Sequence, residues 1–262
     1  MKTRVITAVI ALIVFIPFIL YGGLPLTIFA MALSLIAMSE LLVMKKMFLT
    51  SFAAILSFLG VLVVAMPSSW VAWMPDQLGR MSLLYIIVIL LLAHTVFHRQ
   101  RFTFEDTGVL VLGMIYIGFG FNAFVIARSV NFQTLLYGML IVWLTDSFAY
   151  ICGRKIGKHK LAPKVSPNKT WEGSIAGTVI ATVVLAIYLL IFPVGYHNVF
   201  MMILMTLVLS IIGQIGDLIE SALKRYYGVK DSGKILPGHG GILDRFDSML
   251  VVLPAMYILG IL

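Results

Sequence analysis

Carboxylates inside long apolar stretches are the first residues here that could do chemistry. The chain has 11 acidic residues, and those of its second half are Asp146, Glu172, Asp217, Glu220, Asp231, Asp244 and Asp247. A carboxylate at membrane depth is costly unless it is paired or hydrated, so it usually marks a functional site. Asp146 interrupts one apolar run, and Asp217 lies near the end of another. One such residue could be half of a structural ion pair, but several together favour a function.

The spacing of these acids suggests a metal-and-phosphate site. On a helix, residues three or four positions apart share a face. One polar stripe therefore comprises Asp217, Glu220, Ser221, Lys224 and Arg225, and a second comprises Asp244, Asp247 and Ser248. The segment 226–242 joins the two stripes, so they can lie side by side. Carboxylates and waters are the ligands that Mg²⁺ prefers, and Lys and Arg suit phosphates.

Two loops could bind an anion. The joining loop carries Lys230, Lys234 and the run Gly238–His239–Gly240–Gly241. Glycines let backbone N–H groups approach a phosphate closely, although glycines in turns are common too. The loop 153–173 is densely basic around its one carboxylate, Glu172. Such density exceeds ordinary cytoplasmic bias and suggests a site for a triphosphate or a lipid phosphate.

The elements that position these groups must be membrane helices. The chain has 262 residues, 61% hydrophobic and 11% charged, with a mean hydropathy of +1.06. A soluble domain carries roughly 25% charged residues, so a soluble enzyme, a disordered tail and a secreted scaffold are excluded. Cys152 is the one cysteine and has no internal partner. Apolar runs long enough to span occur at 5–21, 24–44, 48–66, 81–97, 107–127, 134–152, 175–192, 199–219 and 243–262.

The distribution of positive charge predicts the orientation. With a cytoplasmic N-terminus and nine crossings, 17 of the 19 Lys and Arg residues, Lys2 and Arg4 among them, fall on the cytoplasmic side. Only Arg80 and Arg128 fall outside. The net charge of +8 is then explained without nucleic acid. We expect an all-α polytopic membrane protein of about nine transmembrane helices, with the N-terminus cytoplasmic and the C-terminus outside.

Domain organisation is expected to be simple. We expect one membrane domain over 1–262, with hydrophobic N-terminal helices to 130 and catalytic helices and cytoplasmic loops over 131–262. The first two runs could pair as a re-entrant hairpin around Gly22, Gly23 and Pro25. That hairpin fits better than a cleaved signal peptide, because the first run is long and lacks a small-residue cleavage site.

A gap-free stretch of about 27 residues resembles a known family. It holds Ser221, Lys224, Arg225, Lys230, Asp231, Gly233, Leu236, Pro237, His239, Gly240, Gly241, Ile242, Asp244, Arg245, Phe246 and Asp247. It looks like the signature of phosphatidate cytidylyltransferases, also called CDP-diacylglycerol synthases. A second region, from Asp146–Tyr150 through Ser166–Gly173, is also similar, with Ser147 where Thr is more frequent and Asn168 where Lys or Gly is frequent.

The resemblance implies a multi-pass enzyme of the bacterial inner membrane. It would make CDP-diacylglycerol and pyrophosphate from CTP and phosphatidate with Mg²⁺, at the cytoplasmic face; a second cation and a homodimer are left open. For the metal we expect Asp217 and Asp244 first, then Asp247, with Asp146 and Glu220 as second choices. Phosphates would be held by Lys169, Lys224, Arg225, Lys230 and Lys234. The rest of the substrate site would comprise Ser166, Asn168, Ser221, Arg245, Gly240 and Gly241, with His239 shaping the loop.

Two alternative functional hypotheses remain open. A CTP-dependent lipid-alcohol kinase, or a cytidylyltransferase acting on an ether lipid, would use similar carboxylates and basic loops. An ion-coupled transporter could also use intramembrane carboxylates and helix-breaking glycines. A transporter should place them near the midplane in two related halves, whereas these acids lie at one face in one half.

Overall fold

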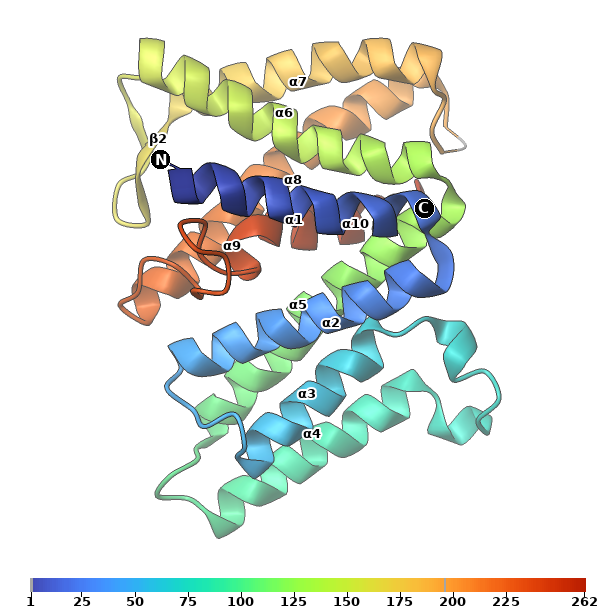
Figure 1. Cartoon of the computed structure of the whole chain (residues 1–262), viewed down its shortest axis with the longest axis vertical. Helices are drawn as coiled ribbons and strands as arrows, with labels where there is room; N and C mark the ends of the chain where they lie inside the picture. Colours follow the sequence, from blue (N-terminus) through green and yellow to red (C-terminus); the bar gives the residue numbers. More distant parts are fainter. Residues whose placement is uncertain (1, 196) are drawn as a thin grey trace. The chain divides into compact units, whose positions relative to one another are not determined.

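Helices form nearly all of the computed structural model (Figure 1). It describes residues 2–195 and 197–262; the side chains of residues 2–5, including Lys2 and Arg4, and of Asp76 lie outside the described part. The helices are α1 (Lys2–Tyr21), α2 (Gly23–Met44), α3 (Phe52–Ala65), α4 (Arg80–Phe97), α5 (Phe104–Val130), α6 (Phe132–Ile156), α7 (Trp171–Ile191), α8 (Val199–Tyr226), α9 (Leu243–Phe246) and α10 (Met249–Ile258). The 3₁₀ turns η1 (Ser68–Trp70) and η2 (Asp76–Leu78) precede α4, and strands β1 (Lys160–Ala162) and β2 (Ser166–Thr170) form an antiparallel hairpin before α7.

The prediction of an all-α polytopic membrane protein is confirmed. Six helices, α2, α4, α5, α6, α7 and α8, are long and apolar enough to cross a membrane, and each coincides with one predicted run to within a few residues, except at the end of α8. The described part of α1, together with α3 and α10, forms shorter apolar helices. The count of nine crossings and the sides of the two termini therefore stay predictions.

The last predicted run is not one helix. It divides into α9 and α10, and the 10 residues of α10 cover about 15 Å, half of the hydrocarbon thickness. The division falls at Asp247–Ser248, and a second acid, Asp244, lies in the short helix before it. In contrast, α8 continues past the predicted end at 219 to Tyr226. Its 28 residues cover about 42 Å, so about one-quarter of the helix exceeds the hydrocarbon core.

The chain forms two compact units. Unit 1 comprises the chain up to Ile126 together with Asp231–Asp244, and unit 2 comprises Ala127–Lys230 with Arg245–Leu262. The first boundary lies close to the division expected at 130. The segment 231–244, which we grouped with the second half, folds with unit 1. The expectation of a single membrane domain stays a prediction.

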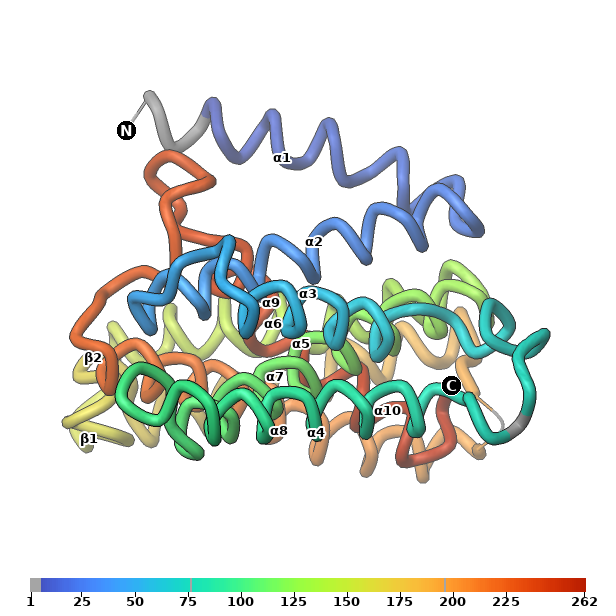
Figure 2. The backbone as a smooth tube through the Cα atoms, turned by 90° about the horizontal axis from the view of Figure 1, so that it is seen from below, coloured from blue at the N-terminus to red at the C-terminus, as the bar shows by residue number. Residues whose placement is uncertain are grey.

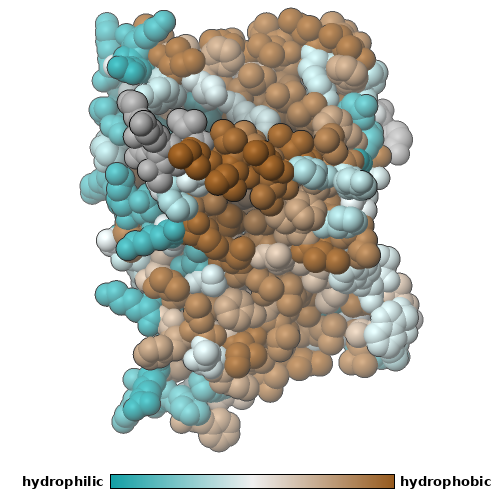
Figure 3. Space-filling view, in the orientation of Figure 1, coloured by the Kyte–Doolittle hydropathy of each residue, from teal (hydrophilic) through white to brown (hydrophobic). Residues whose placement is uncertain are grey.

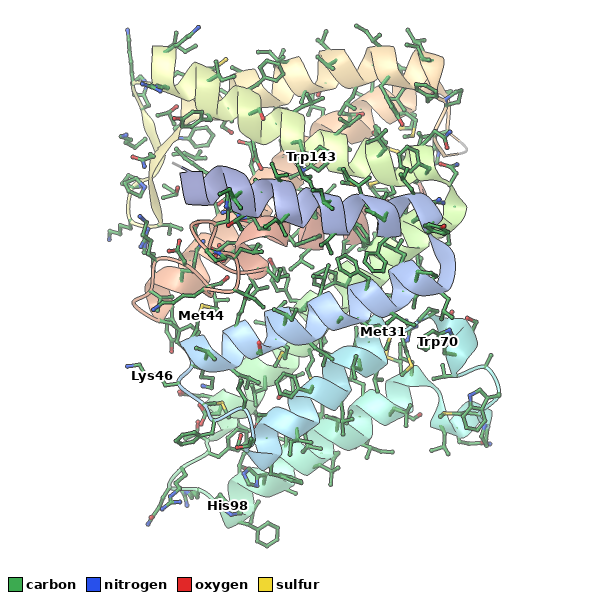
Figure 4. All side chains as sticks on the ribbon, viewed as in Figure 1. Met31, Met44, Lys46, Trp70, His98 and Trp143 are labelled. Atoms are coloured by element: carbon green, nitrogen blue, oxygen red, sulfur yellow. The ribbon has the colours of Figure 1, made fainter. Side chains whose placement is uncertain are left out.

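In unit 1, α1 and α2 form an antiparallel hairpin (Figure 2). The turn uses Gly22 and Gly23, whose φ angles of 67° and 53° favour glycine. Lys46 and His98 lie at one end of this unit and Trp70 at the other (Figure 4). The basic loops that follow α2 and α4 therefore share an end, as the charge distribution predicted, although the compartment it faces stays a prediction.

In unit 2, α6 and α7 pack closely because α7 has glycines at the contact. A Cβ added to Gly177 would lie 2.6 Å from the carbonyl oxygen of Thr145. Hydroxyls link the helices further: Thr145 and Ser210 share a 2.7 Å hydrogen bond, and Ser210 donates to Thr178 at 3.1 Å. Hydrophobic side chains cover α6 and α7, and hydrophilic ones gather at the end with the hairpin (Figure 3).

Gly177→Ala is expected to destabilise the protein, because the added methyl group meets backbone that cannot move aside. Overpacking of this kind costs typically about 1–3 kcal/mol. Gly108→Ala in α5 is the matched control, since nothing lies within 4 Å of its added Cβ and Ala is the better helix former. Thermal unfolding in detergent, followed by circular dichroism, should show a lower midpoint for Gly177→Ala only. Equal midpoints in the two variants would contradict the close packing of α6 on α7.

Candidate active site

Three aspartates of unit 2, Asp146 in α6, Asp217 in α8 and Asp247 between α9 and α10, form what we call the carboxylate cluster. Their carboxyl groups lie within electrostatic range of one another. α8 approaches the bend at Asp247 closely because Gly216 has no side chain: a Cβ there would lie 3.1 Å from the carbonyl oxygen of Asp247. The fold of unit 2 thus brings together three acids that the sequence predicted for the site, Asp146, Asp217 and Asp247.

Lysine side chains partly neutralise the cluster. Lys169 Nζ lies 2.6 Å from Asp217 Oδ2, and Ser221 Oγ donates to Asp217 Oδ1 at 3.2 Å. One turn further, Lys224 forms an ion pair with the fully buried Glu220. The predicted polar stripe on α8 is therefore confirmed as two pairs at i, i+4. Glu220, a second-choice metal ligand, is engaged by Lys224, and its metal role stays a prediction.

The β1–β2 hairpin presents Lys169 to the cluster. Glu172 closes the hairpin by accepting hydrogen bonds from the backbone N–H groups of Lys158 at 3.0 Å and His159 at 3.2 Å. Arg225 Nε donates to the carbonyl oxygen of Val165 at 3.3 Å, which fastens the hairpin to the end of α8. Ser166 and Asn168 lie on β2 with Lys169, the former half-buried and the latter exposed.

The glycine-rich loop of unit 1 is folded around Asp244. Its Oδ2 atom accepts hydrogen bonds from Ser232 N and Gly241 N, both at 2.8 Å, and from Ser232 Oγ at 2.9 Å. Gly240 adopts a φ of 80°, and a Cβ there would lie 2.4 Å from Asp244 Oδ2. His239 N donates to Leu236 O within the same loop. Asp244 thus has an observed structural role, and its metal role stays a prediction.

The remaining basic residues of the predicted site lie around this loop. Lys234 is exposed in unit 1, and Lys230 and Arg245 are exposed in unit 2, where the loop begins and ends. Their contact with phosphates stays a prediction.

Sequence reasoning missed Glu40. It lies in α2 and is only 5% exposed, and its carboxylate accepts hydrogen bonds from Ser232 Oγ at 3.1 Å, Ile242 N at 2.7 Å and Leu243 N at 2.9 Å. The signal was present, because Glu40 is an acid within a long apolar run, as Asp146 is. It was overlooked because the other unusual residues lie in the second half.

The donor chemistry of the cluster suits a divalent cation. Among the residues that the structure describes, no group of three or more His, Cys, Asp and Glu side chains is close enough to hold a metal ion. Mg²⁺ in nucleotide sites is usually bound by one or two carboxylates together with substrate phosphates. Asp217 and Asp247 offer hard oxygen ligands of this kind on neighbouring segments, so the residues fit an ion that enters with its nucleotide.

Comparison with known proteins covers the whole length of the chain. The profile of the cytidylyltransferase family matches residues 2–262. A phosphatidate cytidylyltransferase of Staphylococcus haemolyticus (strain JCSC1435) is 46% identical over 259 residues, which is 99% of this chain and 98% of the relative. Its counterpart in Staphylococcus aureus (strain COL) is also 46% identical over the same shares, and that of Staphylococcus epidermidis (strain ATCC 12228 / FDA PCI 1200) is 44% identical. The chain therefore belongs to the cytidylyltransferase family, among its phosphatidate cytidylyltransferases.

Proposed function

We propose that this protein transfers the cytidylyl group of CTP to phosphatidate and releases pyrophosphate. The activity follows from the full-length match to phosphatidate cytidylyltransferases. We further propose that the reaction takes place at the cytoplasmic face of a bacterial inner membrane. The observation that carries the location of the site is the ion pair of Lys169 with Asp217 beside two further aspartates.

The reaction brings two anions together. A phosphate oxygen of phosphatidate attacks the α-phosphorus of CTP, and the bond from that phosphorus to the bridging oxygen of pyrophosphate breaks. The second pKa of a phosphomonoester is about 6, so the attacking oxygen is largely ionised at neutral pH and needs no general base. Positioning and charge neutralisation are therefore the main catalytic tasks.

Basic residues of the hairpin and of α8 supply positive charge for these tasks. We assign Lys169 and Lys224 to the phosphates of CTP, because each already binds a carboxylate and can exchange that partner for a phosphate. Arg225 and Lys230 add charge for the leaving pyrophosphate. Mg²⁺, held by Asp217 and Asp247 with Asp146 nearby, would neutralise phosphate charge when it binds with CTP.

The depth of the site suits one soluble and one lipid substrate. About 30 Å of α8 fills the hydrocarbon core, and the remainder carries Glu220, Lys224 and Arg225. Asp217 then lies near the interface between lipid and water. CTP can reach it from the aqueous side, while phosphatidate keeps its acyl chains in the bilayer.

Product analysis tests the reaction. The purified protein in detergent is given phosphatidate, Mg²⁺ and CTP labelled with ³²P at the α position. We expect label in the lipid phase together with pyrophosphate, and neither product without phosphatidate. Label transferred from γ-³²P CTP to an added lipid alcohol, with release of CDP, would instead show a lipid kinase. A folded protein that transfers label in neither assay would contradict both enzymatic hypotheses and favour an ion-coupled transporter.

A further inference from the structure

A buried carboxylate from the first half of the chain supports the glycine-rich loop. Glu40 is separated by 192 residues from Ser232 and by 203 from Leu243, yet its side chain bonds to both. It lies in an apolar helix where an ionised group is costly without partners. Ser232, Ile242 and Leu243 supply those partners from 231–244, a segment of the same unit (Figure 2).

The loop has space for Glu40 because two of its residues are glycines. A Cβ on Gly233 would lie 2.6 Å from Glu40 Oε1, and a Cβ on Gly241 would lie 2.4 Å from both oxygens. Gly241 also donates its N–H to Asp244. These two glycines therefore admit a protein carboxylate, and Gly241, which the sequence suggested for phosphate binding, has this observed structural role.

Glu40 and Asp244 fasten the loop at shared points. Both carboxylates contact the hydroxyl of Ser232, and Glu40 accepts the consecutive N–H groups of Ile242 and Leu243 at the start of α9. N–H groups at a helix start have no partner within their own helix. The position of Asp244, and with it the path of the loop that carries Lys234, thus depends on Glu40.

We propose that Glu40 is a positioning residue for cytidylyl transfer, one that holds the 231–244 loop in the arrangement the reaction requires. The inference rests on the proposed function for its catalytic consequence. The loop contacts themselves are independent of that function. Glu40 acts through the loop and is not placed in contact with either substrate.

Glu40→Gln tests whether the carboxylate of Glu40 is needed, because an amide cannot accept the same hydrogen bonds. Oε1 accepts from Ile242 N, and Oε2 accepts from Leu243 N and Ser232 Oγ. A glutamine has one acceptor oxygen and one NH₂ donor. In either orientation of the amide, its NH₂ group faces the N–H of Ile242 or of Leu243. Two donors then face each other, and at least one hydrogen bond is lost.

Hydrogen exchange measured by mass spectrometry provides a readout that does not need activity. In Glu40→Gln, we expect amides of the 231–244 peptides to exchange about 10-fold faster or more, with α6–α8 unchanged. We also expect kcat at saturating CTP and phosphatidate to fall by about 10-fold or more while the thermal midpoint moves by a few degrees. Glu105→Gln, an exposed acid in the first turn of α5, is the matched control and should alter neither quantity.

Ser232→Ala tests the same contact from the loop, and serves if Glu40→Gln does not fold. It should also speed exchange of the 231–244 peptides. Combined with Glu40→Gln it should lower kcat by much less than the product of the two single effects, because the hydroxyl and the carboxylate act together. Unchanged loop exchange in both single variants would overturn the positioning role. Faster loop exchange in a protein that makes no CDP-diacylglycerol would support the positioning role and overturn the proposed function instead.

Discussion

Asp217→Asn is expected to lower kcat by roughly 100- to 1000-fold, the range seen when a preorganised electrostatic group is removed from an active site. Asp217 is the member of the carboxylate cluster that meets both Lys169 and Ser221. The substitution keeps the shape of the side chain and removes only its charge. The measurement is steady-state production of lipid-phase label from α-³²P CTP at saturating phosphatidate.

Folding should survive this change. Asp217 loses its ion pair with Lys169, but the repulsion that it exerts on Asp146 and Asp247 is lost at the same time. We therefore expect an unchanged or slightly raised thermal midpoint. Glu105→Gln, which removes an exposed charge far along the chain, should keep full activity. Turnover of Asp217→Asn within a few-fold of the unchanged protein would remove Asp217 from the site.

Lys169→Met is expected to lower kcat/KM for CTP by about 10- to 100-fold. A hydrogen bond to a charged group is worth about 1.5–3 kcal/mol, and about 1.4 kcal/mol corresponds to a factor of ten. Lys169 Nζ is buried against Asp217, so a nucleotide phosphate would have to replace that carboxylate as its partner. Initial rates over a range of CTP concentrations, at fixed phosphatidate, give the change.

The effect of Lys169→Met on stability should be opposite in sign to that of Asp217→Asn. Without Lys169 the carboxylate of Asp217 loses its cationic partner, so the thermal midpoint should fall. Lys46→Met is the control: Lys46 is an exposed lysine between α2 and α3, and both rate and midpoint should be retained. A midpoint that rises in Lys169→Met would contradict the observed pairing with Asp217.

Much of the fold could be predicted because membrane helices have a strong sequence signal. Each of the six long helices overlaps a predicted run, and where a helix ends in apolar residues its boundary lies within a few residues of the predicted one. The polar ends of the helices were missed, above all the extension of α8 from 219 to Tyr226, since charged residues ended the predicted runs early. The break at Asp247–Ser248 was also missed, because an apolar run does not show whether its backbone bends.

The site was only partly predictable. Spacing on one helix correctly placed Ser221 with Asp217 and Lys224 with Glu220, because i, i+4 contacts are local. The contact of Lys169 with Asp217 depends on how a hairpin folds back on α8. The contact of Glu40 with residues about 200 positions later depends on tertiary packing, which no local pattern reveals.

The bond between Glu40 and the amide of Ile242 also has a consequence for biosynthesis. Glu40 leaves the ribosome 202 residues before Ile242, so α2 enters the membrane with a carboxylate whose backbone donors have not yet been made. Until then, water or lipid headgroups must satisfy that carboxylate, which favours a shallow or loosely packed α2. The full set of hydrogen bonds to Glu40 can thus form only after residues 242 and 243 have been synthesised. A chain terminated before Ile242 would keep Ser232 but lack both backbone N–H groups that bind Glu40.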